Sequence, residues 1–211
     1  MTEAAPTTGG RKVERRKDIR NRLLVAIEEL AAGGEPYATV KVERLVSVAG
    51  ISRATFYIYF DGKADLLQAW FAETMRELAE AATDWRAIES RPSEDELRAA
   101  LDRIIDCYGK HAAVMAAVYD EATQNAALRE GLNEAIAVAT ESVCSHIETG
   151  QREGWVDPTL LAPETAAWLV WMLERGLNQV IPGSKRARKA GLKANFASMV
   201  WHVLYAPKSA A

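Results

Sequence analysis

Apolar residues recur at spacings of three and four along almost the whole chain, and this periodicity limits the possible folds more than any other feature. The clearest stripe, Ile19, Leu23, Ile27 and Leu30, places four side chains on one face of a helix. Alternating apolar and polar runs bounded by turns, the pattern of a strand, do not recur. Glycine and proline stand between the periodic segments rather than inside them. The pattern therefore predicts an all-α protein without a sheet.

The turn signals divide the periodic segments into about nine expected helices. Gly33 and Gly34 end the first helix, since glycine is common just after a last helical turn, and Ser52 is placed to cap the third. Residues 1–10 are expected to form a disordered tail, and the basic run 185–189 a solvated loop. The expected helices cover about residues 12–32, 41–49, 53–60, 63 to 84 or 87, 94–108, 112–123, 126–153, 163–180 and 190–205.

The composition excludes several classes of protein. Of the 211 residues, 49% are hydrophobic and 26% are charged, which is ordinary for a globular protein. The longest apolar run, residues 166–173, is far shorter than the ~20 residues of a membrane-spanning helix, and residues 1–10 lack the apolar segment of a signal peptide. Cys107 and Cys144 fit neither a zinc pattern nor a disulfide framework. We therefore expect a cytoplasmic protein that needs no membrane, metal or cofactor.

The charges are distributed unevenly along the chain. The formal net charge is −3, but residues 1–65 hold eleven basic and nine acidic residues. Within them, Arg11–Arg22 holds seven basic and two acidic residues. A basic end on an acidic chain is typical of a surface that binds phosphates. It is equally typical of a solvated tail, and charge alone leaves both interpretations open.

The segment from Leu45 to Phe60 is the most informative one for function. It has the pattern of a helix, a turn of about four residues at Gly50, and a second helix. That is the spacing of a helix-turn-helix, in which the second helix enters the major groove of DNA. In the second helix, Phe56 and Phe60 share a face and are expected to be core residues.

The opposite face of this second helix has side chains suited to DNA. Ala54 and Ile58 point away from the expected core, where small apolar groups can contact thymine methyls. Arg53 can read a guanine edge or hold a phosphate. The hydroxyls of Thr55 and Tyr57 suit phosphate oxygens. An apolar residue such as Ile58 on a solvent-facing position is explained if that face meets DNA.

The same segment resembles the TetR family of transcriptional regulators. The resemblance covers about residues 15–70 and is carried by Ala49–Arg53, Thr55–Tyr57, Tyr59–Phe60 and Lys63. It implies a three-helix DNA-binding domain, a helical ligand-binding domain, a homodimer and a palindromic DNA operator.

We therefore divide the chain into a DNA-binding domain over residues 11–65 and a ligand-binding and dimerisation domain over residues 66–211. Two positions depart from the family pattern. Lys41 stands where the family has a capping Ser or Thr, and can reach a phosphate instead, and Gly62 replaces a small polar residue. Combining the resemblance with the helix faces, we expect these DNA-binding residues: Lys41, Ser52, Arg53, Ala54, Thr55, Tyr57, Ile58 and Lys63.

Beyond residue 85 the chain resembles the subgroup of ethionamide-resistance regulators, EthR. The resemblance runs through Tyr108–Val114, Glu174-Arg175, Trp201 and Tyr205. It implies a long, narrow and mainly apolar tunnel for a small ligand, although the same apolar residues can be ordinary core. By position, the tunnel residues are Leu97, Ile104, Tyr108, Leu132, Ile136, Ala139, Val143, Val170, Leu173, Glu174 and Trp201.

Glu174 is a carboxylate in a helix expected to be largely buried, and a buried carboxylate needs a partner. Arg175 points about 100° away on a helix and is not an obvious partner. Glu174 can anchor a donor group of a ligand, form an ion pair across a dimer interface, or be exposed. The last two helices carry more apolar face than one side of a bundle requires, which favours a four-helix dimer interface. We expect this interface at Trp168, Met172, Arg175, Phe196, Met199, Val200 and Val203.

These features favour a repressor that binds a palindromic operator as a dimer and is released by a small, largely apolar ligand. The alternative is a DNA-binding regulator without a small-molecule ligand, controlled by a protein partner. An enzyme is not expected, because the chain has no nucleophile elbow, no phosphate-binding glycine loop and no paired metal-ligand spacing. The three histidines, His111, His146 and His202, are isolated in the sequence.

Overall fold

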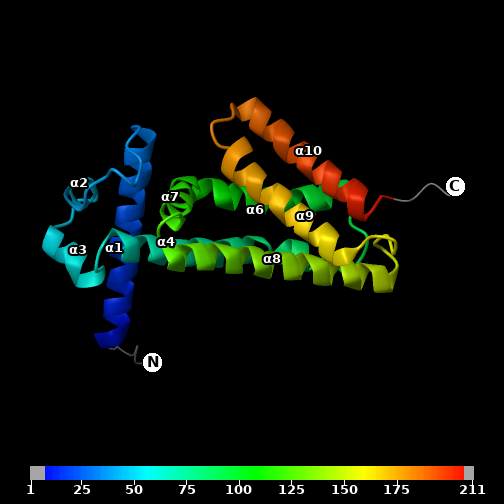
Figure 1. Cartoon of the computed structure of the whole chain (residues 1–211), viewed down its shortest axis with the longest axis horizontal. Helices are drawn as coiled ribbons and strands as arrows, with labels where there is room; N and C mark the ends of the chain where they lie inside the picture. Colours follow the sequence, from blue (N-terminus) through cyan, green and yellow to red (C-terminus); the bar gives the residue numbers. More distant parts are fainter. Residues whose placement is uncertain (1–7, 207–211) are drawn as a thin grey trace, which may run out of the picture. The chain divides into compact units, whose positions relative to one another are not determined.

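The computed structural model describes residues 8–206, with side chains from residue 13 onward, and every regular element in this part of the chain is a helix. The predicted all-α class is therefore confirmed. No helix in the same range is both long and apolar enough to cross a membrane. The elements are α1 (Thr8–Ala32), α2 (Val42–Val48), α3 (Arg53–Tyr59), α4 (Lys63–Ala81), α5 (Thr83–Arg86), α6 (Glu94–Lys110), α7 (Ala112–Ala122), α8 (Ala126–Glu153), α9 (Ala162–Arg175), a π-helical segment (Gly176–Val180) and α10 (Arg186–Leu204) (Figure 1).

Three expected boundaries differ from the structure. The fourth helix ends at Ala81, because Ala82 has ψ of −2° and redirects the chain into the short helix α5, which buries Trp85. The prediction that the basic run 185–189 forms a loop is wrong, because α10 begins at Arg186. Lysine and arginine are good helix formers. Residues 8–10 of the expected tail belong to α1, and residues 1–7 lie outside the described part.

The described chain packs as two compact units that interleave in sequence. The first unit takes in the residues up to Glu73 and also Ala113–Asn125, so it includes most of α7. The second unit takes in Thr74–Ala112 and the residues from Ala126 onward. The division by packing falls within α4. The boundary expected between residues 65 and 66 also lies in α4 and stays a prediction.

In the first unit, α2 packs against both α1 and α3, and the three helices lie together in Figure 1. The apolar stripe of α1 is buried as its spacing predicted. Opposite it, Leu45 of α2 and Phe56 of α3 have no exposed surface. A hydrogen bond connects α4 to α1, since Nε1 of Trp70 donates to the carbonyl oxygen of Arg20 at 3.1 Å. The core of this unit thus fixes the orientation of α3.

In the second unit, α8 packs along α9 and α10 packs along α6. One apolar cluster joins these helices with α5, and it contains Trp85, Leu101, Ile147, Ala166 and Leu204 among its fully or nearly fully buried members. At the edge of this cluster, the buried His146 lies between aromatic rings. Its Nε2 is 2.7 Å from the hydroxyl oxygen of Tyr205. Its ring centre is 4.6 Å from that of Trp85 and 5.0 Å from that of Trp155.

Burial lowers the pKa of His146 to about 4, so acid is expected to destabilise the fold. Between about pH 6.5 and pH 4 the unfolded chain binds a proton at this position and the folded chain does not, so stability falls as the pH falls. The full loss is about 3 kcal/mol. The Tm measured across this pH range should fall less steeply for H146Q than for the wild type. The variant H202Q, at an exposed histidine, should keep the wild-type slope; equal slopes for all three proteins would contradict this assignment.

Candidate functional site

The turn before α3 has the geometry expected of a helix-turn-helix. Gly50 has φ of +63°, a left-handed conformation that glycine adopts without a steric penalty. The hydroxyl oxygen of Ser52 accepts the backbone N–H of Thr55 at 3.0 Å, so the predicted N-cap is confirmed. The two hydroxyl oxygens of these residues lie 2.9 Å apart. Lys41 precedes α2 without a side-chain cap bond, also as expected.

Arg22 holds this turn from the neighbouring helix α1. Its Nη2 donates to the carbonyl oxygens of Ala49 at 2.9 Å and of Gly50 at 2.7 Å. Carbonyls at a helix C-terminus lack intrahelical partners, so a cation is well placed there. A Cβ atom at Gly50 would lie 3.2 Å from the same nitrogen, a close approach that further favours glycine. Arg22 was not among the expected site residues, because nothing local in the sequence indicates a contact 27 residues away.

The outward face of α3 is the one expected to meet DNA. Ile58 is 66% exposed and Tyr57 is 48% exposed, and Ala54 is exposed beside them. Phe56 and Phe60 are buried, and the Arg16 guanidinium lies 5.3 Å from the centre of the Phe60 ring. The predicted division of α3 into a core face and an open face is therefore confirmed.

Arg53, at the start of α3, is exposed but has partners within the protein. Its Nη1 lies 2.8 Å from Oε1 of Glu43, and its guanidinium lies 5.9 Å from the centre of the Tyr57 ring. An exposed ion pair of this kind contributes only about 0–1 kcal/mol. A phosphate or a guanine edge can therefore replace Glu43 at low cost.

Lys63 has a different environment from the one that the resemblance implied. Its Nζ donates to the carbonyl oxygens of Tyr37 at 2.6 Å, Ala38 at 3.3 Å and Val40 at 2.7 Å. It also lies 4.5 Å from the centre of the Tyr37 ring, and burial lowers its pKa. The three donors of the ammonium are thus directed at the loop before α2. Lys63 positions that loop in this structure, and its expected phosphate contact stays a prediction.

In the second unit, five buried side-chain polar atoms have no hydrogen-bond partner among the described residues. Two of them, the hydroxyl of Tyr108 on α6 and Oε2 of Glu174 on α9, belong to the expected tunnel residues. Burial raises the pKa of Tyr108, and the negative charge of Glu174 raises it further. The side chain of Glu174 is only 10% exposed, and the Arg175 Nε lies 3.5 Å from its Oε2. Exposure of Glu174 is therefore excluded, and Arg175 is closer than the helical angle suggested.

The other expected tunnel residues are distributed between core and surface. Ala139 is exposed on α8 and does not lie in the interior of the chain. Trp201 donates from Nε1 to the carbonyl oxygen of Pro92 at 3.1 Å. Leu97, Ile104, Val143 and Trp201 belong to or pack against the apolar cluster of the second unit. Leu132 is buried, and Glu174 is nearly so. The partly buried residues are Ile104, Ile136, Val143, Val170, Leu173 and Trp201.

A groove of about 590 Å³ lies between the start of α6 and α10. Its lining combines polar side chains such as Ser93, Arg98 and Asn195 with alanine and glycine, and it contains none of the expected tunnel residues. Ser93 and Glu96 form a capping box at this helix start. The groove is therefore a separate feature from the Tyr108 and Glu174 pair.

The expected interface residues are also divided by the structure. Trp168 is 77% exposed, which is unusual for the largest apolar side chain. Met199 and Val203 are exposed on α10, and Arg175 is exposed at the end of α9. By contrast, Val200 is buried in the core of its own chain, and Met172 and Phe196 pack partly against that core.

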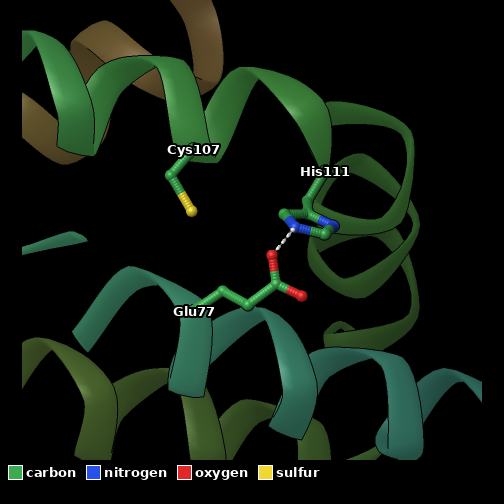
Figure 2. A group of neighbouring side chains, drawn as sticks. All are labelled: Glu77, Cys107 and His111. Carbon is green, nitrogen blue, oxygen red and sulfur yellow. Dashed lines mark hydrogen bonds and ion pairs between the residues drawn. The ribbon is translucent and has the colours of Figure 1, made fainter. Parts of the chain in front are cut away.

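Three side chains that the sequence analysis did not bring together meet between α4 and α6. The candidate metal-ligand atoms of Glu77, Cys107 and His111 all lie within 4.8 Å of one another, and the side chains point toward one another in Figure 2. The Nε2 of His111 is 2.9 Å from Oε2 of Glu77, so His111 is not isolated. The signal in the sequence is the i, i+4 spacing of Cys107 and His111, which places both on one helix face; Glu77 has no such local signal.

Comparisons with known proteins agree with the helix-turn-helix geometry. Residues 23–70 match the family described as "Bacterial regulatory proteins, tetR family". The HTH-type transcriptional regulator EthR of Mycolicibacterium smegmatis is 28% identical over 184 residues, which cover 83% of this chain and 82% of that protein.

Two solved structures show the same fold over most of the chain. A transcriptional regulator from Saccharomonospora viridis in complex with choline has a TM-score of 0.69 at 21% identity, and covers 89% of this chain and 98% of its own. A TetR transcription regulator from Haloarcula marismortui has a TM-score of 0.73 at 16% identity, with 91% and 99% covered. These structures show that the fold is shared, and the sequence matches support a TetR-family transcriptional regulator.

Proposed function

We propose that the protein is a cytoplasmic, dimeric repressor that binds a palindromic operator and releases it when a small, largely apolar ligand binds the second unit. The exposed apolar face of α3 carries the DNA-binding part of this proposal. Ile58, Ala54 and Tyr57 form that face, and the Arg22 contacts with the turn fix its orientation. Two such helices in a dimer reach successive major grooves when they lie about 34–36 Å apart.

Exposed apolar side chains near the end of the chain support the dimer. Trp168 and Trp171 are exposed on α9, and Met199 and Val203 are exposed on α10. Large exposed apolar groups that gather on neighbouring elements are typical of protein–protein interfaces. The interface we propose is centred on Trp168 and does not include Val200, which is buried within its own chain.

Two buried atoms without a hydrogen bond, the Tyr108 hydroxyl oxygen and Oε2 of Glu174, support a ligand in the second unit. A buried hydroxyl or carboxylate oxygen without a hydrogen bond is costly, and a ligand can supply the missing donor. The other residues expected to line the tunnel are mostly aliphatic. We therefore propose an apolar ligand with one end that is a hydrogen-bond donor or a cation. The choline bound to the Saccharomonospora viridis regulator is a ligand with such a cationic end.

The helix α4 offers a route by which ligand binding in the second unit affects DNA binding by the first. It begins in the first unit and ends in the second, so it is a covalent connection through which a change in one unit can reach the other. A ligand that binds one conformation better than the other shifts the population toward that conformation. It lowers operator affinity if that conformation spaces the two α3 helices unsuitably for DNA.

A ligand site at Tyr108 predicts an unusual effect of Tyr108→Phe on stability. The variant removes a buried hydroxyl that has no hydrogen-bond partner. The free energy of unfolding of the ligand-free protein should therefore stay unchanged or rise by up to about 1 kcal/mol, and its Tm should not fall. The thermal melt should be measured after native mass spectrometry has shown the sample to be free of small molecules. A clear loss of stability would instead mean that the hydroxyl is needed by the fold.

The proposal as a whole is tested by a gel shift with purified protein and the DNA that flanks its own gene, in rising salt. A discrete shift that resists competitor DNA supports an operator-binding regulator. A smear that salt abolishes indicates non-specific binding only. Native mass spectrometry of the same sample then shows whether a copurified small molecule or a protein partner is present, and a copurified protein would favour control by a partner over control by a ligand.

A further inference from the structure

We propose that Glu77, Cys107 and His111 form a binding site for one divalent transition-metal ion of the zinc type, which links the end of α4 to the end of α6. All three residues belong to the second unit. Cys107 and His111 are separated by one helical turn, and Glu77 faces them from α4 (Figure 2). This site is distinct from the Tyr108 and Glu174 pair and from the DNA-binding face.

The distances are close to those of a bound ion. All ligand atoms lie within 4.8 Å of one another, whereas the ligand atoms around a tetrahedral zinc ion lie about 3.5 Å apart. Side-chain rotations that shift the ligand atoms by about 1 Å or less close this difference. The Nε2 of His111 and Oε2 of Glu77, now 2.9 Å apart in a hydrogen bond, would separate slightly to admit the ion.

The Cys107 thiol is the observation that points to a ligand. Its residue is 9% exposed, the thiol is directed at the Glu77 and His111 pair in Figure 2, and no hydrogen bond to it is found in the described part of the chain. A buried cysteine beside a histidine and a carboxylate offers one soft and two harder ligands. That combination suits zinc, cobalt or copper and does not suit magnesium or calcium.

The charges of the site also match a divalent cation. When the ion binds, the S–H bond of Cys107 breaks, its proton passes to solvent, and the sulfur forms a bond to the metal. The resulting thiolate and the Glu77 carboxylate balance the two positive charges, and neutral His111 contributes a lone pair. The side chain of Glu77 is 36% exposed, which leaves a path for entry and a fourth position for water.

Cobalt absorption spectroscopy tests the site on the full chain without a histidine tag, after chelation of residual metal. We expect one Co²⁺ per chain, with the charge-transfer absorption of a cobalt–thiolate bond, and displacement by Zn²⁺ with a rise in Tm. Cys107→Ser should abolish the charge-transfer band. Glu77→Gln, at a side chain that is 36% exposed, should weaken Co²⁺ binding by at least about 10-fold.

Cys144→Ser is the matched control. Cys144 also has a carboxylate neighbour, since its Sγ lies 3.7 Å from Oε1 of Glu148, but it belongs to none of the metal-ligand groups found among the described residues. This variant should keep the full cobalt spectrum. The proposal is overturned if the wild type shows no cobalt–thiolate band, or if the band persists in Cys107→Ser. Neither result affects the gel shift, so failure of the metal site and failure of the repressor proposal remain distinguishable.

Discussion

Replacing Phe56 with alanine is expected to destabilise the first unit by about 3–5 kcal/mol. Phe56 is fully buried in the core of the unit, and its ring centre lies 5.7 Å from that of Phe60. A domain has only about 5–15 kcal/mol of stability in total, so a large part of the folded population should be lost. Urea unfolding followed by circular dichroism should show a transition at lower urea, and operator binding should weaken accordingly.

The control for this prediction is Ile58→Ala on the same helix. Ile58 is 66% exposed, so its truncation should change stability by no more than about 0.5 kcal/mol. Similar losses in the two variants would mean that the face of α3 turned toward the core has been assigned incorrectly. Because the chain has two units, the two transitions should be fitted separately where they do not coincide.

Replacing Ile58 with glutamate is expected to lower the affinity for the operator about 100-fold or more. The change removes an apolar contact and brings a negative charge to the DNA, and each half-site then loses about 1–3 kcal/mol. The fold should be unaffected, since the side chain is mostly exposed. Affinity for the operator should be measured by gel shift or fluorescence anisotropy at fixed salt, with the Tm recorded for the same sample.

Val25→Glu is the matched variant for this experiment. Val25 is an apolar residue of α1 in the same unit and is 63% exposed, close to the value for Ile58. The variant Val25→Glu introduces the same charge at a position outside α3, so it controls for the change in net charge. We expect near wild-type operator affinity for this variant. An equal loss in both variants, or no loss in Ile58→Glu, would show that α3 is not the helix that contacts the bases.

The features that depend on neighbouring residues were predictable from the sequence. Helical spacing indicated which face of α1 and α3 is buried, and the Ser52 cap and the Gly50 turn follow from local backbone chemistry. The exposed position of Ile58 follows from the same 3.6-residue period. Together these local rules gave the all-α fold and the open face of the helix-turn-helix.

The features that the sequence did not reveal depend on how helices pack. Arg22 meets the α2–α3 turn, and Lys63 meets the carbonyls of the loop before α2, only because the packing angle between helices brings them there. The Glu77, Cys107 and His111 cluster needs α4 to lie against α6. The end of α4 at Ala81 goes with the burial of Trp85 in the following helix α5, which no local signal indicated.

The interleaving of the two units has a consequence for protein engineering. Because the first unit includes Ala113–Asn125, a fragment cut after Glu73 would lack a segment that belongs to its own packing. The negative charge of Glu121 in that segment acts on the pKa values of Tyr37 and Lys63. The missing segment therefore lies near the loop before α2 and the start of α4. Hybrid regulators that exchange operator specificity should therefore transplant both stretches, or keep the native scaffold and exchange only the exposed residues of α3.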